Sequence, residues 1–194
     1  MSGGRAIRRR IGDERGVTIT EMLVVLVILA IVLGGMTTLF VSAGTSQVDQ
    51  TNRVRAQQEA RLALDSLRRE IHCAKEVVVG STPASSIRIT LGSYCPTYKA
   101  SEPSVTWCAR TVVASTRYAL VRFGTAPTPG TCPAGGVQRA DYLTTATIFT
   151  SYVAPAGGNL GTLAVLLPVD VSPADGKQRF TLRDDIVLRN SGRG

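Results

Sequence analysis

Four cysteines are the residues of this chain whose type and spacing most directly suggest chemistry. They all follow the longest apolar run, an arrangement that predicts an exported, oxidised segment with two disulfides. Four cysteines allow three pairings, and the sequence does not choose among them. A zinc site is the weaker interpretation because the chain has no CxxC spacing and a single histidine. We therefore expect no metal and no cofactor, and the candidates for disulfide formation are Cys73, Cys95, Cys108 and Cys132.

Two pairs of adjacent residues also carry reactive groups, and neither pair predicts catalysis. His72 and Cys73 are neighbours on an expected helix, where adjacent side chains diverge by about 100°, so they cannot act together as base and nucleophile. Asp184 and Asp185 could bind calcium from a loop, but we interpret them as solvated turn residues. The sequence also lacks a GxGxxG motif, a Walker loop and a Ser/His/Asp set. We predict that the protein is not an enzyme.

The longest apolar run extends from Met22 to Met36 and contains no charged residue. Together with its flanks it makes residues 17–41 long enough to cross a hydrocarbon core of about 30 Å at about 1.5 Å per residue. Residues 1–16 carry five arginines against two acidic residues. By the positive-inside tendency, this excess keeps the amino terminus in the cytoplasm and places the remainder outside. We predict a single-pass protein of the cytoplasmic membrane.

Between Val17 and Val79 there is no proline, and the sequence changes from uniformly apolar to amphipathic. We predict one long helix here, with residues 42–79 as an amphipathic stalk that Gly80 and Pro83 terminate. Three glycines in the first half of this helix could kink it. Alternating steps of four and three residues define the apolar stripe of the stalk, which consists of Ala60, Leu64, Leu67, Ile71, Ala74 and Val78.

Residues 80–194 have the composition of a β-rich head, with β-branched runs separated by Gly, Pro, Ser and Thr. The predicted fold class is therefore α+β, a long N-terminal helix packed on a C-terminal antiparallel sheet. We expect the last strand to be interrupted at Asp184 and Asp185. The predicted strands are Ile87–Leu91, Val105–Val113, Tyr118–Phe123, Thr147–Tyr152, Leu163–Pro168 and Arg179–Arg189.

The segment Arg15–Glu21, followed at once by the apolar run, resembles the processing site of type IV prepilins and of type II secretion pseudopilins. The resemblance implies that a prepilin peptidase removes residues 1–16 by cutting after Gly16, and that Val17 is then N-methylated. Val17 departs from the usual Phe, and the anchor lacks the helix-kinking proline of many major pilins. The stretches Gln57–Cys73 and Leu182–Ser191 are similar to those of larger minor pilins and J-type pseudopilins.

In that family the fifth residue of the mature chain is a glutamate, and Glu21 matches it. A carboxylate at the edge of a spanning segment is costly unless it is solvated or paired. Leader removal creates an α-amine at Val17, four residues earlier, which could pair with Glu21 of the same chain or of a neighbouring subunit. We therefore expect Glu21 to act in assembly. The alternative is that Glu21 reaches the membrane surface without a partner.

The resemblance also implies the partners: the prepilin peptidase, other pilins or pseudopilins contacted through the N-terminal helix, an assembly-platform membrane protein and the cytoplasmic membrane. A minor pilin of a cell-surface pilus is the expected function, with a type II secretion pseudopilin as the alternative. The head's charge of +5 also permits DNA capture, as in competence pili. A further rival is an ordinary secretory signal cut after Ala43, which releases a soluble head. The sequence leaves open which machine, filament position and head ligand apply.

Overall fold

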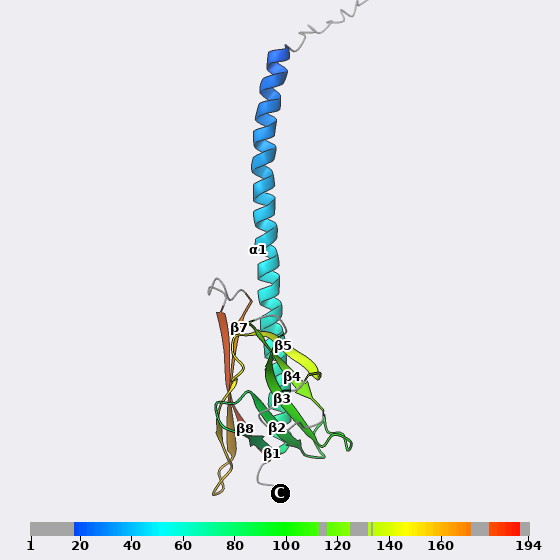
Figure 1. Cartoon of the computed structure of the whole chain (residues 1–194), viewed down its shortest axis with the longest axis vertical. Coiled ribbons are helices and arrows are strands. Elements are labelled where there is room, and N and C mark those ends of the chain that lie inside the picture. The colour runs from blue at the N-terminus through cyan, green and yellow to red at the C-terminus, as the bar shows by residue number, and fades with distance from the viewer. Residues whose placement is uncertain (1–17, 113–115, 125–131, 133, 172–178, 191–194) are drawn as a thin grey trace, which may run out of the picture. The chain divides into compact units, whose positions relative to one another are not determined.

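The structure is a computed structural model that describes residues 18–112, 116–124, 132, 134–171 and 179–190 (Figure 1). The chain forms two compact units, Met1–Gln47 and Val48–Gly194. A single helix, α1, contributes to both and is followed by eight strands, which confirms the α+β class. The elements are α1 (Ile19–Cys73), β1 (Ala74–Val79), β2 (Ser86–Leu91), β3 (Ser104–Thr111), β4 (Tyr118–Phe123), β5 (Val137–Leu143), β6 (Phe149–Val153), β7 (Gly161–Asp170) and β8 (Arg179–Leu188).

All strand pairs are antiparallel, in the order β1-β2-β3-β4-β5-β7-β6, and β8 pairs with β7 off this path. The β7–β8 ladder runs without a break from Gly161↔Leu188 to Asp170↔Arg179. By contrast, β5 reaches β7 at one pair, Leu143↔Val169. The strands β1–β5 and the strands β6–β8 are therefore two groups joined through a narrow contact.

The core of the second unit lies between the second half of α1 and the sheet. Five of the six residues of the predicted stripe are buried, and Val78 is half-buried. Ala74 and Val78 belong to β1 instead of α1. Ala60, Leu64, Leu67 and Ile71 lie on one face of α1 because of their steps of three and four residues, so hydrophobic burial holds this half of the helix on the sheet. The largest buried side chains around them include Trp107, Phe149, Ile87, Ile89, Leu120, Leu143, Leu163 and Leu167.

Strand β8 is tied to α1 along its length. The Arg68 guanidinium donates to Asp184 Oδ2 at 2.8 Å, and Asn190 Nδ2 donates to the His72 carbonyl oxygen at 2.8 Å. The Arg61 guanidinium lies 5.9 Å from the centre of the Phe180 ring. The predicted interruption at Asp184 and Asp185 is wrong, because both lie within β8 and are paired with β7. The ion pair with Arg68 accounts for an acidic residue in this strand.

The helix ends six residues earlier than expected, at Cys73, and Ala74–Val79 forms β1. Three consecutive valines favour a strand, and pairing with β2 satisfies the backbone groups on that side of it. The Gly92 N–H also donates to the Cys73 carbonyl oxygen at 3.4 Å. A second strand was missed: β5 begins with three exposed residues and shows no alternation that would reveal it.

The two predicted disulfides are confirmed, and the structure settles their pairing as Cys73–Cys95 and Cys108–Cys132. Their sequence separations of 22 and 24 residues correspond to a loop-closure stabilisation of about 3 kcal/mol each in the chain-entropy model. The first bridge joins the end of α1 to the loop after β2. The second attaches Cys132 to the face of β3 that carries a separate apolar cluster with Ala119, Val121 and Phe123.

A buried carboxylate connects α1 to the centre of the sheet. Glu70 is 1% exposed, and its Oε2 accepts a hydrogen bond from Trp107 Nε1 at 2.6 Å. Its Oε1 accepts from Arg122 Nε at 2.8 Å and lies 2.8 Å from Arg122 Nη2. One side chain of α1 thus binds β3 and β4 together. Because a buried charge is tolerated only when paired, this network fixes the register of the helix on the sheet.

We expect Glu70→Ala to destabilise the second unit by about 3 to 5 kcal/mol, because it leaves the buried Arg122 guanidinium and the Trp107 N–H unpaired. Glu70→Gln keeps an acceptor for Trp107 and should cost less. Denaturant unfolding of the full chain in detergent, followed by fluorescence of its single tryptophan, measures both. Glu76→Ala removes an exposed carboxylate and is the matched control. Equal midpoints for Glu70→Ala and the control would contradict the role of Glu70.

Candidate processing and assembly segment

The start of α1 is capped by Thr18. The Glu21 N–H donates to the Thr18 carbonyl oxygen at 3.0 Å and approaches Thr18 Oγ1 at 3.4 Å, and the Met22 N–H donates to the same carbonyl at 3.2 Å. Thr18 and Glu21 have the spacing of a capping box, in which a hydroxyl satisfies a free N–H of the first turn. The helix dipole also favours the carboxylate of Glu21 at this end. The local sequence therefore fixes where the helix begins.

Every residue from Thr18 to Gln47 is exposed, including large apolar side chains such as Leu39 at 71% and Phe40 at 76%. This part of α1 is apolar on all sides, and α1 is long and apolar enough to cross a membrane. An exposed apolar surface of this extent is unfavourable in water, so lipid or other helices must cover it.

The few polar groups of the apolar segment are satisfied inside the helix. Thr37 Oγ1 donates to the Leu33 carbonyl oxygen at 2.8 Å, and Thr38 Oγ1 donates to the Gly35 carbonyl oxygen at 2.8 Å. A hydrocarbon environment offers no other acceptor, so these bonds lower the cost of placing threonines there. The helix continues through Gly34 and Gly35 without a break.

Residues 12–37 match the family model described as the prokaryotic N-terminal methylation motif. This match covers the expected cleavage site, the capped start of α1 and the whole apolar run from Met22 to Met36. The chain fits the type IV pilin-like family. The motif marks this pilin-like chain as a prepilin peptidase substrate, and the apolar helix fits a membrane-anchored pilin. Searches of curated proteins and of solved structures gave no match to it.

The residues predicted to act in processing lie at the edge of what the structure describes. Gly16 and Val17 fall outside the described residues. Glu21 lies in the first turn of α1 with its side chain exposed, and no described residue supplies a cation to its carboxylate. The cysteines gather in the second unit, away in sequence from this segment.

The other candidate residues of this pilin-like protein have structural roles. Cys73 is held in its disulfide, so it offers no thiol beside His72. Asp184 and Asp185 are strand residues rather than solvated turn residues, and each lies near an arginine. Among the described residues no group of three or more His, Cys, Asp or Glu side chains gathers as a metal site.

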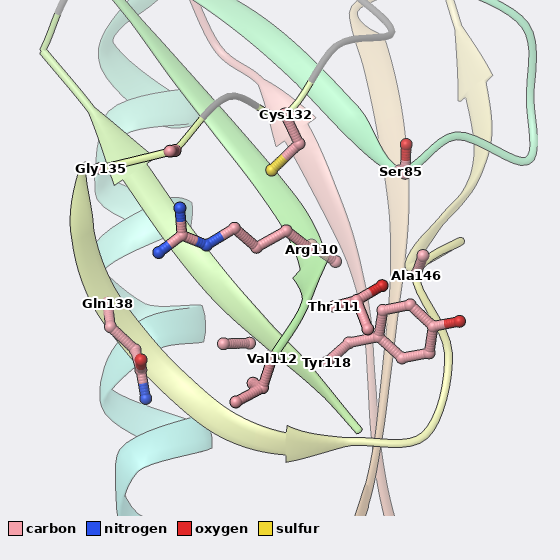
Figure 2. A pocket seen from close by; sticks show the side chains of 12 residues that line it. Ser85, Arg110, Thr111, Val112, Tyr118, Cys132, Gly135, Gln138 and Ala146 are labelled. Atoms are coloured by element: carbon pink, nitrogen blue, oxygen red, sulfur yellow. The ribbon is translucent and has the colours of Figure 1, made fainter. Parts of the chain in front are cut away.

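A pocket of about 750 Å³ opens on the sheet of the second unit (Figure 2). Arg110 and Gln138 line one part of it together with Cys132, and Thr111 and Tyr118 line another. Arg110 is the charged member of the described lining, which contains no carboxylate or imidazole. The described lining thus holds no acid–base pair of the kind that general acid–base catalysis uses.

Two structurally important residues, the helix cap Thr18 and the buried Glu70, were not predicted from the sequence. Each could have been recognised from its spacing in the sequence. Thr18 precedes Glu21 by three residues, which is the capping-box spacing ahead of an apolar run. Glu70 lies three residues after Leu67 and four before Ala74, so it occupies the apolar stripe of the stalk. A lone carboxylate on a buried stripe indicates a buried partner, although the sequence does not say that the partners are Trp107 and Arg122.

His72 lies in the last turn of α1 among arginines. Burial, followed by the charges of Arg189 and Arg68, lowers the pKa of His72 below its usual value of 6.5, and Asp184 opposes this shift. The unfolded chain therefore binds a proton at this site more readily than the folded chain. Because of this difference, the stability that His72 contributes is present above about pH 6.5 and is lost as the pH falls.

We expect the melting temperature of the full chain to fall between pH 7.5 and pH 5.5, and His72→Gln should reduce that fall. His72 is the single histidine, so few other groups titrate in this window. Thermal melting of both proteins in detergent across the range is the measurement. Lys75→Gln, which changes an exposed residue three positions away, is the control. An identical pH dependence in His72→Gln and the parent would rule out this assignment.

Proposed function

We propose that this chain is a minor pilin, a low-copy and non-enzymatic subunit of a type IV pilus or related filament. The observation that carries the proposal is a prokaryotic N-terminal methylation motif placed directly at the start of a wholly exposed apolar helix. A soluble protein would have to bury that helix within its own fold, whereas a filament subunit can place it first in lipid and then against its neighbours.

Processing is proposed to occur between Gly16 and Val17, followed by methylation of the Val17 amine. The proposed new amino terminus lies two residues before the first helical residue, Ile19. Glu21, in the first turn of that helix, is then four residues from the amine, which is one helical turn. Its carboxylate pairs with the Val17 amine of its own chain or of a neighbouring subunit, and the second pairing sets the axial offset between subunits.

The head supports a minor rather than a major role. The head contains eight strands and two disulfides among the described residues. We take a head of this size to favour a minor pilin over a compact major pilin. A secretion pseudopilus remains within the same proposal, because the N-terminal segment serves both kinds of filament.

Three residues that capture of DNA could use are engaged within the head. Trp107 is fully buried rather than available for stacking. Arg122 is paired with the buried Glu70, and Arg117 lies 3.6 Å from Asp141 and over the Tyr142 ring. Several cations of the head are therefore already engaged within the protein.

Mass spectrometry of the mature protein should find an amino terminus at methylated Val17. Gly16→Leu, which puts a bulky side chain at the proposed cleavage position, should leave the full-length precursor. Ala43→Leu is the matched control, because it would block an ordinary signal peptidase and should leave this processing unchanged. A product beginning at Gly44 would remove the pilin proposal and support the secreted-head alternative.

Glu21→Ala should leave cleavage at Gly16 largely intact and remove the protein from filaments. The substitution strands the Val17 amine, and it makes membrane insertion easier, so failed anchoring cannot explain the loss. Fractionation of cells into membranes and sheared filaments measures the distribution of mature protein. Asp49→Ala, which removes an exposed carboxylate beyond the apolar run, is the control. Normal incorporation of Glu21→Ala would show that this carboxylate has no part in assembly.

A further inference from the structure

Strands β1, β6 and β8 each pair with a single neighbouring strand, and β8 and β1 differ in what protects their open side. Strand β8 is the outer strand on one side, and contacts from α1 to Phe180, Asp184 and Asn190 hold it against the helix. Strand β1 is the first strand of the sheet order and pairs with β2 alone. A register shift between Ala74 and Glu76 and the charges of Lys75 and Glu76 protect its first half, and three valines without such protection follow.

The open edge of β1 borders a groove. Its lining consists of Lys75–Val79 of β1 together with Tyr152, Ala154, Pro155 and Leu188. The groove has a volume of about 480 Å³, and it is lined mostly by apolar side chains. Because its lining includes five consecutive residues of β1, the groove follows most of this strand.

Main-chain pairing joins the chain beyond β1 to the start of β6. The Ala84 N–H donates to the Phe149 carbonyl oxygen at 2.8 Å, and the Phe149 N–H donates back to Ala84 at 3.1 Å. This pair joins the segment between β1 and β2 to the first residue of β6. Beyond it β1 and β6 have no ladder between them. The seam between the β1–β2 hairpin and β6 is thus hydrogen-bonded at one residue pair outside β1, and β1 itself has no ladder across it among the described residues.

We propose that the β1 edge takes up an extended segment of a companion protein as an added strand in the assembled filament. This inference rests on the proposed function. The edge of a strand presents a row of main-chain donors and acceptors, and an extended polypeptide is the partner that satisfies them in sequence. The pair between Ala84 and Phe149 shows that the seam already supports such hydrogen bonds.

The charges along β1 specify the added segment. Antiparallel strands pair best when opposite charges face each other and when β-branched or aromatic residues face valines. The added segment therefore carries three β-branched or aromatic residues opposite Val79, Val78 and Val77, then a basic residue opposite Glu76 and an acidic residue opposite Lys75. Burial, followed by the negative charge of Glu76, raises the pKa of Tyr152 above its usual value of 10.0.

Hydrogen–deuterium exchange resolved to single residues tests this proposal on the full chain. Exchange is compared between protein in sheared filaments and unassembled protein solubilised from membranes. In filaments, alternate amides of β1 should exchange at least about tenfold more slowly, because only every second N–H points toward an added strand. Amides of β3, which is paired on both sides, should be unchanged.

The variant Val78→Lys places a charge on the edge and should abolish the slow exchange, whereas Val78→Thr keeps a β-branched residue and should retain it. Unchanged exchange in β3 and β7 verifies that both variants are folded. If the protein is in filaments and β1 exchanges as fast as in the unassembled form, the inference fails. Uniform slowing of all β1 amides would indicate cover by a flat surface and would also overturn it. Absence of the parent protein from filaments would instead contradict the proposed function.

Discussion

The apolar surface of α1 between Ile19 and Gln47 is the constraint on which the rest of the molecule depends. Each large side chain of this segment gains about 1.5 to 3 kcal/mol when it leaves water, and the described part of the chain covers none of it. The fold must therefore keep this segment helical in a nonpolar environment, where unsatisfied backbone groups are costly. The capped start at Thr18 and the internal bonds of Thr37 and Thr38 meet that requirement.

The same helix must then become part of a water-facing head, and its amphipathic half does this with two kinds of contact. The apolar stripe gives most of the burial, while Glu70 binds Trp107 and Arg122 at the centre of the sheet. Apolar residues in place of both Glu70 and Arg122 could bury a similar area. They would not, however, distinguish one register of the helix on the sheet from another. We attribute the buried ion pair to this specificity rather than to stability.

The Cys73–Cys95 disulfide and strand β8 add further contacts between α1 and the head. The Cys73–Cys95 bridge holds the point where the helix ends and β1 begins, and β8 lies along α1 through contacts to Arg61, Arg68 and His72. The disulfide and the contacts with β8 all lie in the carboxyl-terminal part of the helix. They hold the end of the helix that faces the head, whereas the apolar end has no such tether in the described residues.

The sequence predicted the fold class, the apolar segment and the stalk because each depends on a local pattern. Helical spacing located the stripe from Ala60 to Ile71, and an even number of cysteines predicted two bridges. Features set by tertiary pairing were not predictable in this way. The helix was extended over Ala74–Val79 because two of its residues continue the stripe, yet pairing with β2 makes this segment a strand. Asp184 was placed in a turn because its partner, Arg68, is 116 residues away in sequence.

The central claim is that the apolar half of α1 anchors this chain in a membrane before assembly. Alkaline carbonate extraction of membranes from cells that make the full chain, followed by immunodetection of the head, tests that claim directly. In cells without the filament assembly machinery, the account predicts that the mature protein stays in the membrane pellet, because a peripheral protein is released and a spanning helix is not. Recovery of the head in the soluble fraction would contradict it.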